Sequence, residues 1–419
     1  MKNKIKVAIV SKYFPPNIRG GGEISAYNLA KGLSDSGVEV HVITSENITA
    51  IPGSGFVLHP IIKPNILPGV FYHIGNNELF YWNTYKTVSA FLKNNPGIDI
   101  VHAMNMDTIP GVVFAASKHG VKSVATINSH WLTCPYGYML KMYDGFSVCD
   151  GKCNLLSAFR CYRHSSSLLE QLFGPLYSKL QMIERQYSAK KLDGVVCISK
   201  NIHSYVKTIF GDKLTAIIPN ICEFTEPINY NNKFESDILF VGALGKFKGC
   251  EYVIQAMPEI IKKYPECIFR VIGDGDRFNE FKKMTQRLDV SDNVIFEGFV
   301  SSDEIDVYFS KTRIVVFPSI VPETFGRVAA EAMAFCKPVI GSNTGAIPEN
   351  VKHMETGVIV EPANVPEIAD AVLYLLGNHE VAKKMGITGK LISMHKYSTE
   401  FVTNNYLRMY QKVLYPYLK

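Results

Sequence analysis

Residues 322–334 read Pro-Glu-Thr-Phe-Gly-Arg-Val-Ala-Ala-Glu-Ala-Met-Ala, and two carboxylates in this stretch, Glu323 and Glu331, stand eight residues apart. The alanine-rich end predicts a helix, and eight residues are a little over two turns, so Glu331 returns near the face on which the helix begins. Glu323 precedes the helix, beside the unpaired N–H groups of the first turn, those of Phe325, Gly326, Arg327 and Val328. The stretch therefore predicts an anion site next to two carboxylates that accept hydrogen bonds from hydroxyl groups. The alternative is an ordinary helix with two solvated glutamates.

Apolar runs of strand length alternate with helical stretches along the rest of the chain. In the first half the expected strands are 6–10, 38–44, 98–103, 121–127 and 194–199. In the second half they are 237–242, 268–273, 293–297, 314–318 and 338–341. The expected helices include 23–36, 168–192, 250–263 and 276–288. Buried strands separated by helices predict parallel sheets covered on both faces, and hence an α/β fold.

The chain is long enough for two domains. Its 419 residues exceed what one core usually holds, and the segment 219–233, rich in Asn, Pro and Glu, suits a boundary. We therefore expect domains at 1–222 and 223–397, followed by a tyrosine-rich helix at 398–419. Ligands of open α/β sheets bind outside the carboxyl ends of the strands. Two such sheets facing one another would place a site in the cleft between the domains.

The composition limits the class of protein and its compartment. The net charge of +6 is modest for this length, so it argues against a nucleic-acid partner and fits an acidic small ligand or an anionic membrane surface. No cleavage site follows the short apolar run 5–10, and no apolar stretch reaches the ~18 residues of a spanning helix. Nine cysteines without an export signal indicate reduced thiols. We expect a cytoplasmic protein, at most in contact with the inner face of the membrane.

Two glycine-rich turns each join a strand to a helix. Gly20, Gly21 and Gly22 follow the first strand and open a helix, so their backbone can approach a phosphate or a sugar closely. Gly273 and Gly275 likewise end a strand and open a helix. The alternatives are a flexible loop in the first case and an ordinary strand-to-helix turn in the second.

The stretch 322–334 resembles the E-x7-E signature of the retaining glycosyltransferases of family 4, and the resemblance extends over nearly the whole chain. It implies the GT-B fold, in which two Rossmann-like domains face each other across a cleft and a C-terminal helix crosses back onto the first domain. It also implies transfer of a hexose from a nucleoside-diphosphate sugar to a glycan, lipid-linked or small-molecule acceptor. Retention at the anomeric carbon, without a required metal cofactor, is part of the same expectation. In the mechanism that this resemblance favours, a phosphate oxygen of the donor takes the proton of the acceptor.

Several positions take a role in donor binding or catalysis from this resemblance. Lys248 matches the lysine that neutralises the donor diphosphate, whereas Ala243 stands where the family has an arginine. Lys246 could supply the second charge, without the bidentate fork of an arginine. Glu323 would hold sugar hydroxyls, and Glu331 the ribose. Further donor contacts are expected from backbone in segments similar to those of the family, at Gly273, Gly275 and Phe299.

The first domain departs from the family at the active-site histidine. Residues 126–135 read Thr-Ile-Asn-Ser-His-Trp-Leu-Thr-Cys-Pro, and the family's histidine aligns with Asn128. His130 lies two residues later and would point the same way in an extended segment. Either Asn128 acts through a hydrogen bond, or His130 has taken over the catalytic role, or His130 is structural.

The departures at Asn128 and Ala243 keep two other classes of function open. One is a non-catalytic protein that binds nucleotide sugars or serves as a scaffold, and the other is a nucleotide-sugar epimerase or hydrolase on the same fold. The presence of both Lys248 and Glu323 favours a transferase. Turnover of the donor only in the presence of an acceptor would identify one.

Four cysteines fall in one segment rich in Gly, Asp and Asn: Cys134, Cys149, Cys153 and Cys161. Four reduced cysteines in an irregular loop fit a tetrahedral structural metal site, most simply zinc. The spacings are not of the C-x2-C type, so four separate buried thiols are the alternative.

Two segments suit a membrane surface. Residues 66–82 are apolar and aromatic, and the helix 168–192 carries lysine and arginine beside Leu, Phe and Tyr. A core or inter-domain helix is the alternative for 168–192. Because these segments would contact a membrane, a polyprenol-linked acceptor is one of the acceptors that the sequence allows.

Overall fold

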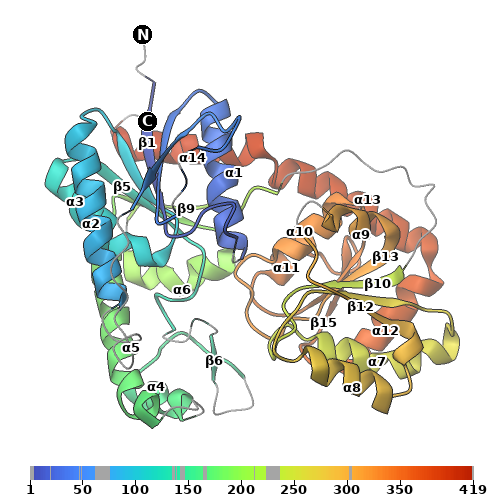
Figure 1. Ribbon diagram of the computed structural model, residues 1–419. Coiled ribbons are helices and arrows are strands. Elements are labelled where there is room, and N and C mark those ends of the chain that lie inside the picture. The colour runs from blue at the N-terminus through green and yellow to red at the C-terminus, as the bar shows by residue number, and fades with distance from the viewer. Residues whose placement is uncertain are drawn as a thin grey trace. The chain divides into compact units, whose positions relative to one another are not determined.

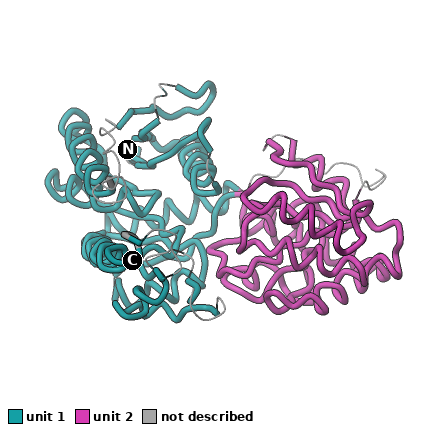
Figure 2. The backbone as a smooth tube through the Cα atoms, turned by 60° about the horizontal axis from the view of Figure 1, so that its bottom comes forward, with its two compact units in different colours: residues 1–221, 399–419 teal, residues 222–398 magenta. Residues whose placement is uncertain are grey.

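The computed structural model of the chain (Figure 1) describes residues 4–18, 20–46, 48, 50–61, 76–134, 137, 139–141, 147–163, 168–211, 213–222, 236–301 and 304–417. Most of the apolar segment 66–82 therefore lies outside the described residues. The chain forms two compact units, and Figure 2 colours them separately. Unit 1 comprises residues 1–221 and 399–419, and unit 2 comprises residues 222–398. The expected boundaries, after residues 222 and 397, each differ from these by one residue.

Unit 1 is built on a parallel sheet of seven strands in the order β3-β2-β1-β4-β5-β8-β9. The strands are β1 (Lys6–Ser11), β2 (Glu39–Thr44), β3 (Val57–Pro60), β4 (Ile100–Ala103), β5 (Lys122–Ile127), β8 (Gly194–Cys197) and β9 (Thr215–Ile217). β4 and β8 are buried along their whole length, as expected of strands covered on both faces. The strand order reverses between β1 and β4, which is the position at which open α/β sheets bind ligands.

The helices of unit 1 are α1 (Gly21–Asp35), α2 (Asn76–Asn94), α3 (Ile109–His119), α4 (Leu155–Tyr162), α5 (Leu168–Ala189), α6 (Lys200–Phe210) and α14 (Thr399–Leu414). The C-terminal helix α14 packs into this unit through two buried tyrosines. Tyr410 Oη lies 2.6 Å from Nδ1 of His102 on β4, and Tyr406 Oη lies 3.0 Å from Oγ1 of Thr126 on β5. Burial lowers the pKa of His102 to about 3, so this imidazole is neutral in the folded protein near neutral pH.

Unit 2 holds a second parallel sheet, of six strands in the order β12-β11-β10-β13-β14-β15. Its strands are β10 (Ser236–Val241), β11 (Phe269–Ile272), β12 (Val294–Gly298), β13 (Thr312–Phe317), β14 (Val339–Ser342) and β15 (Gly357–Val360). Its helices are α7 (Cys250–Lys263), α8 (Phe278–Arg287), α9 (Ile305–Lys311), α10 (Arg327–Ala334), α11 (Ile347–Asn350), α12 (Val365–Gly377) and α13 (His379–Lys396). Counted from β10, the order is 3-2-1-4-5-6, the Rossmann order, with its reversal between β10 and β13. The α/β fold class predicted from the sequence is confirmed.

Candidate active site

Lys248 and Glu323 form an ion pair at the point where the strand order of unit 2 reverses. Lys248 follows β10 and Glu323 follows the neighbouring strand β13, and Nζ of the lysine lies 2.7 Å from Oε1 of the glutamate. Ser319 Oγ donates a second hydrogen bond to the same carboxylate oxygen, at 2.8 Å. The glutamate side chain is 14% exposed and the lysine 36%, so both charges remain within reach of a ligand. Two motif residues far apart in sequence thus meet where a Rossmann-type sheet binds its ligand.

Backbone contacts hold the loops of these two residues together. Ile320 N–H donates to the carbonyl of Phe247 at 3.0 Å, which ties the loop after β13 to the loop after β10. Gly249 caps α7 with a φ of 77°, and a Cβ there would lie 1.9 Å from the carbonyl oxygen of Pro318. Only glycine allows this approach, so the position of Lys248 is fixed by the backbone on its C-terminal side.

A third loop supports Glu323 from the side of β14. Ala346 N–H donates to the carbonyl of Glu323 at 2.7 Å. A Cβ on Gly345, whose φ is 58°, would lie 2.2 Å from the backbone nitrogen of Glu323. The carboxylate is therefore carried on backbone that two neighbouring loops hold in place.

Helix α10 begins directly after this loop, as the sequence predicts. Gly326 caps it with a φ of 81°, and the ring of the buried Phe325 packs edge-on against Tyr397 with centroids 5.4 Å apart. The half-buried Arg327 and Val328 follow in its first turn. Glu331 lies one turn along, with Oε1 3.5 Å from Nη1 of Arg327. Burial raises the pKa of the Glu331 carboxyl, and the guanidinium of Arg327 opposes the shift.

The turn after β11 interlocks with the loop that carries the lysines. A Cβ on Gly273 would lie 1.9 Å from the carbonyl oxygen of Gly242, and one on Gly275 would lie 2.5 Å from that of Leu244. Both glycines are thus needed for close backbone packing, whatever they contribute to a ligand. Gly273 N–H donates to the carbonyl of Gly298 at 2.8 Å, and the next residue, Phe299, is 83% exposed. Lys246, in the loop between β10 and α7, is exposed.

In unit 1, the glycine loop after β1 lies against two asparagines. Helix α1 begins at Gly21, and Gly20 N–H donates to Oε2 of Glu23 at 2.9 Å. A Cβ on Gly22 would lie 3.5 Å from Nδ2 of Asn128 and 3.9 Å from Nδ2 of Asn105. Gly22 lies in the first turn of α1, and Asn105 and Asn128 follow the carboxyl ends of β4 and β5. The three residues therefore lie near the strand-order reversal of this sheet.

The sequence interpretation did not include Asn105. Its Oδ1 accepts hydrogen bonds from Oγ of Ser11, at 2.9 Å, and from the N–H of Lys12, at 2.7 Å. Asn128 is fixed nearby, because its Nδ2 donates to the carbonyl of Met104 at 3.0 Å. The available signal was position alone, since Asn105 comes two residues after β4 ends at Ala103.

His130 is buried, with 2% of its surface exposed. Its ring packs edge-on against Tyr205, with centroids 5.4 Å apart, and its carbonyl accepts hydrogen bonds from the N–H groups of Thr133 and Cys134. His130 therefore forms a turn that leads into the cysteine segment. All four predicted metal-ligand cysteines of that segment line one small pocket.

Solved structures share the fold of the whole chain. The sucrose-phosphate synthase from Thermosynechococcus elongatus is similar with a TM-score of 0.75 and 19% identity, covering 99% of this chain and 100% of that one. Anabaena HepE in complex with UDP-glucose is similar with a TM-score of 0.68 and 15% identity, covering 96% and 98%. The fold, with two Rossmann-type parallel sheets, defines a GT-B protein.

Family comparisons identify the class of enzyme. The Glycosyltransferase Family 4 model matches residues 19–223, and the Glycosyl transferases group 1 model matches residues 224–391. An uncharacterized glycosyltransferase of Methanocaldococcus jannaschii is 27% identical over 431 residues, covering 97% of this chain and 98% of the relative. A GDP-mannose-dependent phosphatidylinositol monomannoside mannosyltransferase of Mycobacterium tuberculosis is 31% identical over 149 residues, covering 34% and 39%. The chain belongs to the family 4 type of glycosyltransferases, and its activity is glycosyl transfer.

Proposed function

We propose that this protein is a retaining hexosyltransferase that takes its sugar from a nucleoside-diphosphate donor held mainly by unit 2. The observation that carries the proposal is the Lys248–Glu323 pair at the strand-order reversal, 2.7 Å apart and partly exposed. A cation for the diphosphate and a carboxylate for sugar hydroxyls are what such a donor requires at adjacent positions. The structures of Anabaena HepE with UDP and with UDP-glucose support a donor of this class.

The chemistry follows from these two side chains and the start of α10. Lys248 and the N–H groups at 325–328 stabilise the negative charge that develops on the leaving diphosphate. The acceptor oxygen bonds to the anomeric carbon on the face that the diphosphate leaves, and the acceptor proton passes to a phosphate oxygen of the leaving group. Glu323 orients the sugar through its hydroxyls and Glu331 holds the ribose. No protein base and no metal cofactor is required for these steps.

Within unit 1, Asn128 acts in this proposal through hydrogen bonding to the sugar or the acceptor. Its amide has no ionisation near neutral pH, so it cannot act as a base. His130 is the alternative, but it is 2% exposed and its ring packs against Tyr205. This burial favours Asn128 for the role, with Asn105 and Gly22 beside it.

We further propose that the acceptor is lipid-linked and that unit 1 approaches it on an anionic membrane surface. Helix α5 exposes a row of large apolar side chains, each 50–69% exposed: Leu168, Leu172, Phe173, Leu176, Leu180, Ile183 and Tyr187. Lys191 continues the row, with Nζ 4.6 Å from the ring centroid of Tyr187 and 5.3 Å from that of Phe114. An apolar helix face that ends in lysine and aromatic residues suits the boundary between headgroups and acyl chains.

An open pocket beside this helix adds to the case for a lipid-linked acceptor. It has a volume of about 510 Å³ and is lined by residues of α2, α3 and α5, among them Trp82, Tyr85, Phe114, Lys118 and Glu184. Aromatic walls with a few charged groups are typical of small-molecule sites. Among the described residues, no helix has the length and hydropathy of a membrane span.

Two experiments test the proposed function. Candidate nucleotide sugars are screened by thermal shift, since a donor at about 100 times its Kd adds ~2.7 kcal/mol of stability. Turnover of the donor that binds is then followed with and without acceptor; turnover only with acceptor supports a transferase, whereas equal turnover without acceptor indicates an epimerase or hydrolase. Binding without any turnover would favour a non-catalytic protein.

Membrane contact is tested with vesicles of phosphatidylglycerol and phosphatidylcholine. The double variant Leu176→Glu/Leu180→Glu is expected to lose co-sedimentation with these vesicles, because both side chains are at least half exposed on the α5 face. Leu391→Glu is the matched control, since Leu391 is 66% exposed on α13 of unit 2. Unchanged sedimentation of the double variant, or self-association through α5 without lipid, would contradict the proposal.

A further inference from the structure

The described residues of the segment between β5 and α5 (128–134, 137, 139–141 and 147–163) form little regular structure. Its described regular structure is the short hairpin of β6 (Leu140–Lys141) and β7 (Ser147–Val148), and the eight-residue helix α4. In α4 only Ala158 is buried, whereas Leu155, Leu156 and Phe159 are 38–62% exposed. Long connections with so little secondary structure are uncommon in compact domains unless something else fixes them. Regular secondary structure therefore does little to fix the described part of this segment.

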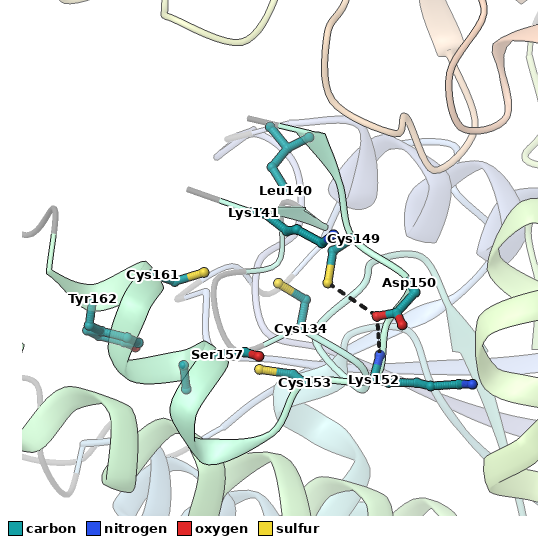
Figure 3. A pocket seen from close by; sticks show the side chains of 11 residues that line it. Cys134, Leu140, Lys141, Cys149, Asp150, Lys152, Cys153, Ser157, Cys161 and Tyr162 are labelled. Carbon is teal, nitrogen blue, oxygen red and sulfur yellow. Dashed lines mark hydrogen bonds between the residues drawn. The ribbon is translucent and has the colours of Figure 1, made fainter. Parts of the chain in front are cut away.

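Four cysteines of this segment border one pocket of about 50 Å³, and Figure 3 shows them around it. They come from four different places in the fold. Cys134 lies in the turn after β5 and Cys149 directly follows β7, whereas Cys153 precedes the N-cap of α4 and Cys161 lies in the last turn of α4. The chain thus folds so that its four clustered cysteines converge, instead of burying each thiol separately.

The backbone at several of these cysteines is held by hydrogen bonds. Cys134 N–H donates to the carbonyl of His130 at 2.8 Å, and Cys149 N–H donates to that of Met139 at 2.7 Å. Cys153 directly precedes Asn154, whose side chain caps α4 through the N–H of Ser157 at 2.8 Å. Cys149 Sγ lies 3.8 Å from Oδ1 of Asp150 and Cys153 Sγ 3.6 Å from the carbonyl oxygen of Asn154, so neither sulfur makes a strong hydrogen bond there.

As the side chains stand, no three His, Cys, Asp or Glu groups among the described residues are arranged to hold a metal ion. Rotation about χ1 between staggered positions, however, moves a cysteine sulfur by up to about 3 Å. The pocket has room for such a rotation. In a zinc site with four thiolates, each sulfur lies ~2.3 Å from the ion. The four thiols already border this one pocket (Figure 3).

We propose that one structural zinc ion binds in this pocket to four thiolates, those of Cys134, Cys149, Cys153 and Cys161. Four sulfur ligands in tetrahedral arrangement are the set that selects zinc over harder divalent cations. Zinc with four thiolates carries two net negative charges, and Lys141 and Lys152 line the same pocket. Lys179 on α5 lies next to one of these cysteines, since its Nζ donates to the carbonyl of Cys153. Asp150 also lines the pocket, but these three lysines outnumber it, so the local charge complements the proposed centre.

The zinc would fix the loop that carries Asn128 and His130. The N–H of Cys134 is hydrogen-bonded to the carbonyl of His130. The ring of Tyr205 packs on His130, and its Oη donates a hydrogen bond to the carbonyl of Cys149 at 3.5 Å. A bound ion would tie these contacts to α4 and α5, so it acts on the active site as a positioning element. The proposal does not depend on which sugar is transferred, or on whether transfer occurs with retention.

Elemental analysis of the full chain, purified without a histidine tag and with reductant, tests the proposal. The expected result is about one zinc per chain, released on titration with an organomercurial that binds thiolates. Cys153→Ser and Cys161→Ser are each expected to reduce zinc content by about tenfold or more after gel filtration against a chelator. Cys336→Ser is the matched control, because Cys336 is also a partly exposed cysteine but belongs to unit 2.

Several outcomes would overturn the proposal. One is zinc below about a tenth of an equivalent both as purified and after incubation with zinc. Others are iron in place of zinc, disulfides among the four cysteines in mass spectra, or full zinc content in both serine variants. If a variant does not fold, the chelator arm on the wild type decides: removal of zinc should raise proteolysis within 128–167 and leave unit 2 intact. Failure of this test would leave donor turnover, and so the proposed function, unaffected.

Discussion

Replacing Lys248 by methionine should greatly reduce transfer while leaving the fold intact. In the structure Nζ lies 2.7 Å from Glu323 Oε1, and a diphosphate oxygen at a similar distance would interact by roughly 5–6 kcal/mol at an effective dielectric constant of 20. Because Lys248 loses part of its interaction with Glu323 when the donor binds, the net interaction free energy with the diphosphate is smaller than this. Loss of one such preorganised charge typically costs about 10²–10³ in kcat, or about 2.7–4 kcal/mol.

Stability should change much less than rate. The lysine is 36% exposed, and pairs of this exposure contribute about 0–1 kcal/mol to folding. Glu323 also keeps its hydrogen bond from Ser319, so the variant does not bury an unpaired carboxylate. The prediction is therefore a large kinetic loss with a shift in Tm of at most a few degrees, about 2–4 °C per kcal/mol for a domain of this size.

The assay is steady-state kinetics on the folded variant with the donor found by thermal shift, together with calorimetry of nucleoside-diphosphate binding. Lys262→Met is the matched control, because Lys262 forms an exposed ion pair with Glu259 on α7, away from the reversal of the sheet. The control should retain full activity. A kcat/KM for Lys248→Met within about threefold of wild type would remove Lys248 from the diphosphate site and refute the reasoning.

Two further predictions concern unit 1. Asn128→Ala should lower kcat. His130→Ala should lower the free energy of unfolding by about 1–3 kcal/mol with a smaller effect on kcat, because that imidazole is buried. Kinetics and urea denaturation measure both effects, and the reverse pattern would assign the catalytic role to His130. The second prediction concerns His102, which binds a proton near pH 6.5 in the unfolded chain but only near pH 3 in the folded chain. The free energy of unfolding should therefore fall as the pH drops below about 6.5, by up to ~1.4 kcal/mol per pH unit. Urea denaturation at pH 7 and pH 5 measures this, and His102→Gln should remove that part of the slope; an unchanged slope would show that His102 is not buried as a neutral ring.

Much of the fold could be predicted because its strands are buried on both faces and form continuous apolar runs. Ten expected strands correspond to strands of the two sheets, and α7 has the predicted bounds Cys250–Lys263. The strands β3, β9 and β15 were not expected. They are three or four residues long and lie at sheet edges, and β3 contains His59 and Pro60, so they lack the long apolar signal of central strands.

The site could be predicted where a motif marks it and not where a single side chain does. Lys248 and Glu323 were expected to act on one ligand because both match motifs of the family, but their direct ion pair depends on β10 and β13 being neighbours, which no local pattern shows. Asn105 was missed because one asparagine after a strand has no distinctive spacing. Likewise, the cysteine spacings do not reveal that the four thiols line a common pocket.

The most direct test of retaining glycosyl transfer is proton NMR of the product formed from a donor of known anomeric configuration, followed from the first turnover. We predict that the newly formed glycosidic bond has the same anomeric configuration as the donor, and that it forms only in the presence of acceptor. Retention requires the acceptor to react on the face that the diphosphate leaves, next to the Lys248–Glu323 pair. An inverted product would contradict the account, because it would require a protein base on the opposite face of the sugar.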